Sequence, residues 1–275
     1  MGRIISFVNR KGGVGKTSTV HHLAGPLSRK GLRVLLVDAD PQSSLTQGLF
    51  GPEALRDLDP RETIAALFDD AGGPPPTDLV RPAGLPGIDL LAGSERMFDH
   101  NLPRPWEAGP LQFALRDALT ELDVAYDLVL VDCPPHIQLV AWAALVASHG
   151  AVVPLQAEDY GAQGLVSILD TIEQVRVVAN PGIALIGFLV TMFNKALSVH
   201  VTYESNLRAL YGDDAFAATI PLAKDFKEAV TLRKTVSAYK PRSAAARAID
   251  ALADELLVRL DARIGHSPAE SRRVA

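Results

Sequence analysis

Residues 9–18 read NRKGGVGKTS and bring together three glycines, two lysines and two hydroxyl side chains. The glycines allow the backbone to turn its N–H groups inward around an anion, and a helix beginning near Lys16 would add the positive end of its dipole. Lys16 would bridge the β- and γ-phosphates of a nucleoside triphosphate, and the Thr17 hydroxyl would coordinate Mg²⁺. The loop therefore predicts a triphosphate site.

The loop departs from the usual pattern of Gly, four residues and Gly-Lys-Ser/Thr, because Arg10 stands at the first glycine and Lys11 adds a second lysine. A lysine at this place cannot easily fold back onto its own phosphates. It could neutralise the phosphates of a neighbouring chain, much as an arginine finger acts in trans. A solvated loop lysine is the alternative.

Acidic residues end two apolar runs. Asp132 closes the run at 126–135, where a phosphate-loop protein places a carboxylate that holds magnesium through water. Asp38 and Asp40 end the run at 32–40, beside the nucleotide in this topology. We interpret Asp40 as the group that positions the attacking water, and Asp38 as a residue of the magnesium network or an ordinary strand end.

The elements that must position these residues alternate along the chain. Continuous apolar runs, typical of strands covered on both faces, occur at 3–8, 32–40, 126–135, 150–156 and 183–191. Helical patterns occur at 17–31, 109–122, 161–178, 199–211 and 243–262. They predict an α/β fold with a doubly wound, mostly parallel sheet and helices on both faces. The Gly- and Pro-rich segment 69–87 is expected to be a surface excursion.

Composition limits the other possibilities. The single cysteine, Cys133, excludes an internal disulfide framework and a multi-thiolate metal site within one chain. The chain begins almost directly with an apolar strand pattern and has no run of transmembrane length, so we expect a cytoplasmic protein. With a net charge of −5, nucleic acid could bind only to a local basic face. We predict one domain over 1–265 and a disordered tail over 266–275.

Four ordered motifs carry a resemblance to a known family. The segments KGGVGKTST, VLLVDADPQSS, DLVLVDCPP and VVPLQAEDYGAQGL together resemble the ParA family of DNA-partitioning ATPases, within the deviant Walker A group of phosphate-loop NTPases. The resemblance implies a slow ATPase that uses ATP, ADP and Mg²⁺ and forms a homodimer around ATP. It further implies non-specific binding to double-stranded DNA, stimulation by a ParB-like adaptor or cargo protein, plasmid or chromosome segregation, a place in the cytoplasm at the nucleoid, and no membrane partner.

The resemblance also assigns roles to residues. Phosphate binding falls on Lys11, Gly12, Gly13, Val14, Gly15, Lys16, Thr17 and Ser18. Lys11 would reach the partner chain's phosphates, Thr17 and Asp132 would hold Mg²⁺, and Asp40 would act on the hydrolytic water. The segments TMFNKA and TIPLAKDF place adenine near Asn194 and Pro221. An asparagine can read an adenine edge, although a turn residue after a strand is the alternative.

The chain departs from this family in two places. Chromosomal relatives commonly continue DCPPSLG with an asparagine a few residues later, whereas this chain has His136 and, at the asparagine position, Ala143. The arginines associated with DNA binding are also missing. The candidates to replace them are Lys195, Lys224, Lys227, Arg233 and Lys234. Residues 191–242 contain 8 Lys/Arg and 5 Asp/Glu, a local excess of +3 that a solvated charged face would also show.

The sequence also bears on other functions that a phosphate loop of this kind could serve. A MinD-type membrane-cycling protein would need a basic amphipathic terminal helix, whereas LADELLVRLDARIG mixes acids into its polar face. An iron–sulfur reductase would need more cysteines. A phosphate-loop synthetase for a small carboxylic acid remains the alternative from a different class, against which the double-lysine loop argues. A related ATPase that positions a protein cargo remains open as well.

Overall fold

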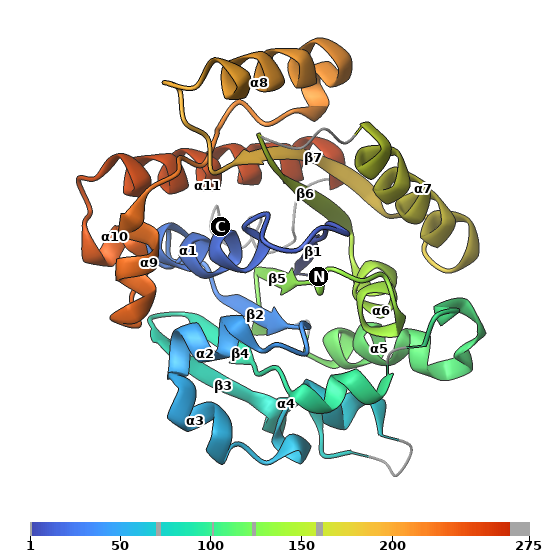
Figure 1. The fold of residues 1–275 in the computed structure, drawn as a ribbon. Coiled ribbons are helices and arrows are strands. Elements are labelled where there is room, and N and C mark those ends of the chain that lie inside the picture. The colour runs from blue at the N-terminus through green and yellow to red at the C-terminus, as the bar shows by residue number, and fades with distance from the viewer. Residues whose placement is uncertain (1, 70–72, 101, 123–124, 158–161, 265–275) are drawn as a thin grey trace, which may run out of the picture.

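The computed structural model describes residues 2–69, 73–100, 102–122, 125–157 and 162–264. Its strands form one sheet in the order β3-β4-β2-β5-β1-β6-β7 (Figure 1). The strands are β1 Arg3–Phe7, β2 Val34–Asp38, β3 Val80–Leu85, β4 Ile88–Leu91, β5 Leu128–Asp132, β6 Gly150–Gln156 and β7 Ala184–Thr191. All neighbouring strands pair in parallel except β3 and β4. The predicted α/β fold is confirmed.

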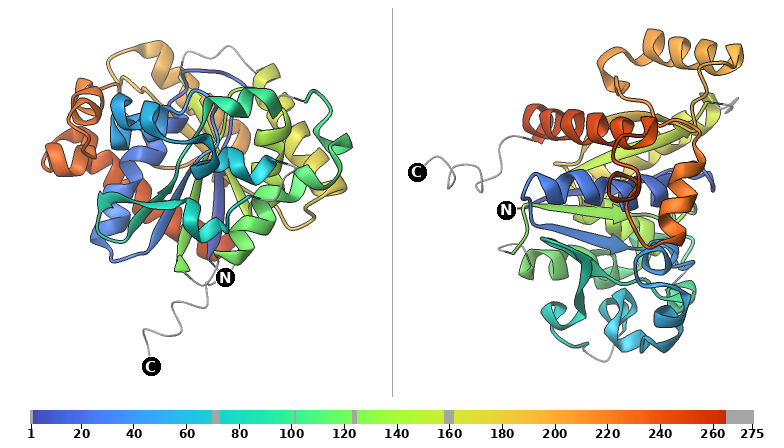
Figure 2. Two further views of the ribbon diagram at one scale, coloured as in Figure 1. Left: turned by 90° about the horizontal axis from the view of Figure 1, so that it is seen from below. Right: turned by 90° about the vertical axis from the view of Figure 1, so that its left-hand side faces the viewer.

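Helices cover both faces of the sheet. They are α1 Lys16–Arg29, α2 Ser44–Phe50, α3 Pro52–Asp57, α4 Pro76–Leu79, α5 Ala114–Glu121, α6 Leu139–Ala147, α7 Ala162–Val178, α8 Ser198–Tyr211, α9 Lys224–Thr231, α10 Val236–Tyr239 and α11 Ala244–Ile264. The α5, α6 and α7 helices lie on one face, and α1, α9, α10 and α11 lie on the other (Figures 1 and 2).

Two apolar cores separate these layers from the sheet. Neighbouring residues of a strand point to opposite faces, so β1 sends Ile4 into one core and Ile5 into the other. The β2 strand divides Leu35 and Leu36 in the same way. Because helices cover both faces of the sheet, its strands read as continuous apolar runs. The polar residues that follow these strands lie together at the carboxyl ends of the sheet.

The expected surface excursion over 69–87 was partly wrong. Residues 70–72 lie outside the described residues, but β3 occupies residues 80–85 and pairs antiparallel with β4 at the sheet edge. Pro82 and Gly84 are residue types that are uncommon inside strands, so the sequence pattern does not indicate a strand here. An edge strand tolerates them because a proline there does not remove a hydrogen bond that a second neighbour needs.

Six helices of the described residues, α2, α3, α4, α6, α9 and α10, lie outside the helical patterns of the sequence. All nine residues of α6 are buried, so the segment has no polar face and no helical period. The α9 helix begins at Lys224, inside the segment TIPLAKDF that the resemblance placed near adenine. No helix of the described residues is long and apolar enough to cross a membrane. The proposed tail at 266–275 lies outside the described residues.

Candidate functional site

The glycine loop connects β1 to α1 at the carboxyl edge of the sheet. Gly13 and Gly15 have φ of 76° and 83°, a conformation that glycine adopts without the strain of a side chain. The Thr191 hydroxyl donates to the Val14 carbonyl at 2.8 Å and so attaches the loop to β7. The α1 helix begins at Lys16, directly after the loop, so its N-terminal N–H groups lie at the site.

The lysine of the loop is turned inward. The Lys16 ammonium group donates to the carbonyls of Asn9 at 3.3 Å and Lys11 at 3.1 Å, and the residue is buried. Burial lowers its pKa, and the negative charge of Asp132 opposes that effect. The loop therefore holds a cation against its own carbonyls, where an arriving phosphate would offer a better partner.

Lys11 lies on the outer side of the loop and is exposed. Its backbone N–H donates to Oδ1 of Asn9 at 2.9 Å, and Nδ2 of Asn9 donates to the Pro154 carbonyl at 2.7 Å. The neighbouring Arg10 side chain instead contacts the Ser167 hydroxyl of the same chain. The loop thus carries three cations: Lys16 is directed inward, Arg10 contacts Ser167 of the same chain, and Lys11 is exposed at the surface.

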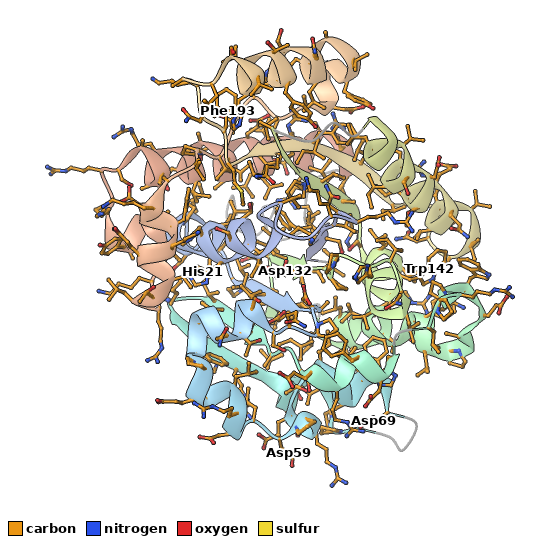
Figure 3. All side chains as sticks on the ribbon, in the orientation of Figure 1. His21, Asp59, Asp69, Asp132, Trp142 and Phe193 are labelled. Atoms are coloured by element: carbon orange, nitrogen blue, oxygen red, sulfur yellow. The ribbon has the colours of Figure 1, made fainter. Side chains whose placement is uncertain are left out.

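Asp132 ends β5 in the centre of the molecule (Figure 3). It pairs in register with Phe7 of β1 and with Asp38 of β2, and its side chain is fully buried. Neither carboxylate oxygen has a hydrogen-bond donor among the described residues. Burial raises the pKa of Asp132 well above its usual value, the charge of Asp38 raises it further, and the nearby Thr17 hydroxyl lowers it without forming a hydrogen bond of normal geometry.

Asp38 is also fully buried, but it has partners. Its Oδ2 accepts from the backbone N–H of Thr46 at 2.8 Å and from the Thr46 hydroxyl at 2.7 Å. The same hydroxyl accepts from the N–H of Gly93 at 2.8 Å. Burial raises the pKa of Asp38 to about 6, although these hydrogen bonds oppose the shift. Asp38 therefore attaches the first turn of α2 to the end of β2.

Asp40 lies two residues beyond β2 and is half-buried. Its Oδ1 accepts from the backbone N–H of Gln42 at 2.9 Å, and its carbonyl accepts from the N–H of Ser43 at 2.8 Å. This turn leads into α2. Of the two acidic residues in the segment, Asp40 is the one with access to solvent.

The geometry fits a magnesium ion at Asp132. A buried carboxylate with no hydrogen-bond donor is costly by itself, and a divalent cation would supply the missing opposite charge. The described residues contain no group of three or more His, Cys, Asp or Glu side chains arranged around a metal. Mg²⁺ commonly takes one carboxylate, a hydroxyl, waters and phosphate oxygens, so Thr17 and Asp132 suit a metal that arrives with a nucleotide.

A cavity of about 640 Å³ opens beside Gly15, Thr17 and Ser18. Its apolar lining includes Met192, Ile220, Pro221, Leu222, Phe226 and Val230. Pro221, a residue expected near adenine, lines this cavity. Asn194 does not line this cavity, and its Oδ1 accepts from the N–H of Ala196 at 3.0 Å in a turn. Met192 and Phe226 belong to the segments TMFNKA and TIPLAKDF, but only the fold shows that these two side chains meet at one cavity.

The five basic candidates are all exposed, but they divide into groups. Lys224 and Lys227 lie on α9, and Lys224 forms an ion pair with Glu228 at 3.2 Å. Arg233 and Lys234 form the turn that follows. Lys195 precedes α8, in a segment joined to the start of α9 by the bridge between Phe193 and Pro221. Lys227 and Arg233 also line the 640 Å³ cavity, a position that sequence alone did not predict.

The two departures from the family pattern lie in different environments. His136 is exposed in the turn after β5, and its carbonyl accepts from the N–H of Gln138 at 2.9 Å. Ala143 is fully buried inside α6. An asparagine at position 143 would therefore need a buried hydrogen-bond partner, whereas alanine packs there without one.

The chain is similar to known proteins in both sequence and structure. Residues 2–185 match a family model described as an AAA domain. The chain is 38% identical to the chromosome-partitioning ATPase Soj of Thermus thermophilus, over 94% of this chain and 96% of that protein. It is 32% identical to the chromosome partitioning protein ParA of Caulobacter vibrioides, over 94% of each. Cobyrinic acid a,c-diamide synthase of Mycobacterium smegmatis, solved with an ATP analogue and magnesium, superimposes with a TM-score of 0.78 at 29% identity, covering 97% of this chain and 98% of that one.

Proposed function

Because the chain belongs to the ParA/Soj family of chromosome-partitioning ATPases, we propose that it is an ATP-driven switch for moving DNA. In this proposal ATP joins two copies into a dimer that binds double-stranded DNA without sequence preference. Hydrolysis to ADP and phosphate, stimulated by a ParB-like adaptor, releases the DNA. The protein would act in the cytoplasm at the nucleoid.

The observation that carries this proposal is that one site contains both a lysine directed inward, Lys16, and a buried carboxylate without a hydrogen-bond donor, Asp132. Lys16 would leave the carbonyls of Asn9 and Lys11 to bridge the β- and γ-phosphates. Thr17 and Asp132 would hold Mg²⁺, which would neutralise charge that develops on the phosphate oxygens. The backbone N–H groups from Gly12 to Ser18 would surround the remaining phosphate oxygens.

Asp40 and Lys11 complete the proposed site. Asp40, which has access to solvent, would orient the attacking water. Lys11, on the outer side of the loop, would contact phosphates of the partner copy and make hydrolysis depend on dimerisation. Asp38 is better suited to fixing α2 than to binding metal, since Thr46 already occupies one of its oxygens.

The nucleoside would occupy the cavity beside Pro221, with its base against the apolar wall. Asn194 would have to release the N–H of Ala196 before its side chain could read an adenine edge. The exposed cations on α9 and in the following turn would contact DNA phosphates. They supply charge but no base-reading geometry, which favours binding without sequence preference.

Two alternative functions would use the same nucleotide site. A related ATPase could carry a protein cargo in place of DNA, since the same switch would serve both. The likeness to the diamide synthase favours a ligase that activates a small carboxylic acid. We prefer the partitioning function because identity is higher to Soj, at 38% over nearly the whole chain, and because Lys11 lies at the surface.

Phosphate release from Mg·ATP separates the partitioning function from the ligase. We expect slow release by the protein alone, faster release with non-specific duplex DNA and adaptor together, and no response to cobyrinic acid with ammonia. Release that requires the acid and ammonia, and that ignores DNA and adaptor, would support the ligase and overturn the proposal.

A further inference from the structure

The α2 helix connects the proposed hydrolytic segment to a distant basic turn. Its first turn contains Thr46, which is held by Asp38, and the helix begins four residues after Asp40. Its far end lies against α9 and the turn at 232–235. If a bound γ-phosphate displaced Asp40, α2 would therefore move with it as a rigid element.

Glycines allow α2 to approach this turn closely. A Cβ added at Gly48 would lie 3.3 Å from Nδ1 of His21 and 3.4 Å from Cγ1 of Val230. A Cβ added at Gly51 would lie only 2.7 Å from Cζ of Arg233. A side chain at Gly48 would press on the buried His21 ring and on Val230, whereas the exposed Arg233 guanidinium could move away from one at Gly51. The contact at Gly48 is therefore the one that links α2 to its neighbours.

His21 lies at the junction of three elements. It belongs to the second turn of α1, faces Gly48 of α2 and donates from Nε2 to the Lys234 carbonyl at 3.1 Å. The side chain is buried between α1 and α9 (Figure 3), and burial lowers its pKa. Because a carbonyl can only accept, Nε2 carries the proton in the contact with Lys234. His22 adds a second contact, because its Nδ1 accepts from the N–H of Val236 at 3.0 Å.

The turn that His21 holds is under backbone strain. Arg233 has φ of 54°, which costs a residue with a side chain on the order of 1 kcal/mol or more. Two hydrogen bonds stabilise it, from the N–H of Arg233 to the Val230 carbonyl at 2.8 Å and from the N–H of Lys234 to the Ala229 carbonyl at 3.0 Å. These two hydrogen bonds close the C-terminal end of α9, and the contacts of His21 and His22 connect that end to α1.

We propose that His21 is a positioning residue which, with Gly48 of α2, couples the state of the nucleotide phosphates to the conformation of the Arg233–Lys234 turn. The consequence for DNA rests on the proposed function, because the turn carries two of its candidate phosphate contacts. The coupling itself does not. Triphosphate would draw Asp40 and α2 toward the phosphate loop, and His21 would transmit that movement to the Lys234 carbonyl.

Hydrogen–deuterium exchange at residues 229–238 tests the coupling, because the N–H groups of Arg233, Lys234 and Val236 all make hydrogen bonds there. In the wild type we expect exchange to differ by roughly fivefold or more between Mg·ADP and a non-hydrolysable Mg·ATP analogue. Measurement over a tenfold range of protein concentration controls for burial by a second copy, which would depend on concentration.

Three variants give the comparison. Gly48→Ala adds a Cβ at the close contact between α2 and His21. Alanine is intrinsically favoured over glycine inside a helix, so we expect the variant to fold. His21→Met removes the hydrogen bond at similar volume, and His21→Gln keeps an N–H donor. We expect the first two to reduce the difference in exchange to less than about twofold at saturating nucleotide, and His21→Gln to retain most of it.

A wild type with no difference between the two nucleotides, or an unchanged difference in both Gly48→Ala and His21→Met, would overturn the coupling. Filter binding of duplex DNA to the same proteins is a separate readout. If the coupling is present and the wild type still fails to bind DNA with ATP, the coupling stands and the DNA-binding function falls.

Discussion

Asp38 and Asp132 are register partners at the carboxyl ends of the adjacent parallel strands β2 and β5, and neither side chain is exposed to solvent. Two carboxyl groups placed side by side in a buried site disfavour each other's ionisation. The fold maintains this arrangement at the point where the glycine loop would deliver phosphates. We infer that the protein accepts a loss of stability in the nucleotide-free state in return for a site that a cation and a triphosphate complete.

The first prediction concerns pH. The pKa of Asp38 is raised to about 6, so its contribution to stability is present below about pH 4 and is lost as the pH rises toward 6. The free energy of unfolding of nucleotide-free Asp38→Asn should gain on that of the wild type by roughly 2–3 kcal/mol between pH 4 and pH 7. Urea denaturation of both proteins across this range measures the gap. A gap that does not change with pH would contradict the assignment.

The second prediction concerns Asp132. Asp132→Asn replaces a buried carboxyl group whose ionisation is opposed by burial and by Asp38, so the nucleotide-free variant should be more stable than the wild type at pH 7 by about 1–3 kcal/mol. Mg²⁺-dependent ATP hydrolysis should fall by on the order of a hundredfold. Denaturation and phosphate release, both with and without EDTA, test the two effects. Lower stability together with normal hydrolysis would show that Asp132 is a structural residue.

The third prediction concerns Lys11. Lys11→Ala should bind ATP within about threefold of the wild type yet fail to form the ATP-dependent dimer, because its target phosphate belongs to the other copy. Light scattering with ATP measures the dimer. Arg10→Ala is the matched control, since Arg10 is a cation on the same loop that contacts Ser167 in cis. Equal dimerisation of Lys11→Ala and the wild type would remove the trans role, and equal loss in both variants would assign it to loop charge in general.

The fourth prediction separates Asp40 from Lys16. Asp40→Asn keeps an oxygen for the N–H of Gln42 but removes the charge. It should bind Mg·ATP normally, hydrolyse at least about tenfold more slowly and accumulate as a dimer. Lys16→Ala should fail earlier, at triphosphate binding, since it removes the bridging charge. Titration with a fluorescent ATP analogue distinguishes the two, and weak nucleotide binding by Asp40→Asn would place Asp40 in the metal site instead.

The sequence predicted the parallel sheet because its covered strands are short, continuous and apolar, and it predicted the phosphate loop because three glycines and Lys16 occur together. The α6 helix was missed because burial on all sides removes the period that identifies a helix. The β3 strand was missed because Pro82 and Gly84 are tolerated only at a sheet edge, which no local pattern specifies. The partnership of Asp38 with Thr46 and the junction at His21 depend on contacts between distant elements, so only the fold could show them.

The central claim is that ATP creates a DNA-binding form of the protein, and the salt dependence of duplex binding tests it most directly. With a non-hydrolysable ATP analogue, the wild type should bind unrelated duplexes equally, and log affinity should fall with log salt by about 0.9 per phosphate neutralised, more steeply than with ADP. Lys224→Gln combined with Lys234→Gln should weaken binding and flatten this slope without altering the dimer. The control, Arg29→Gln combined with Lys30→Gln, removes an equal charge at the C-terminal end of α1, which is the end opposite to the phosphate loop. It should leave the slope unchanged. Equal binding with ADP and the ATP analogue, or a wild-type slope in the Lys224/Lys234 variant, would contradict the account.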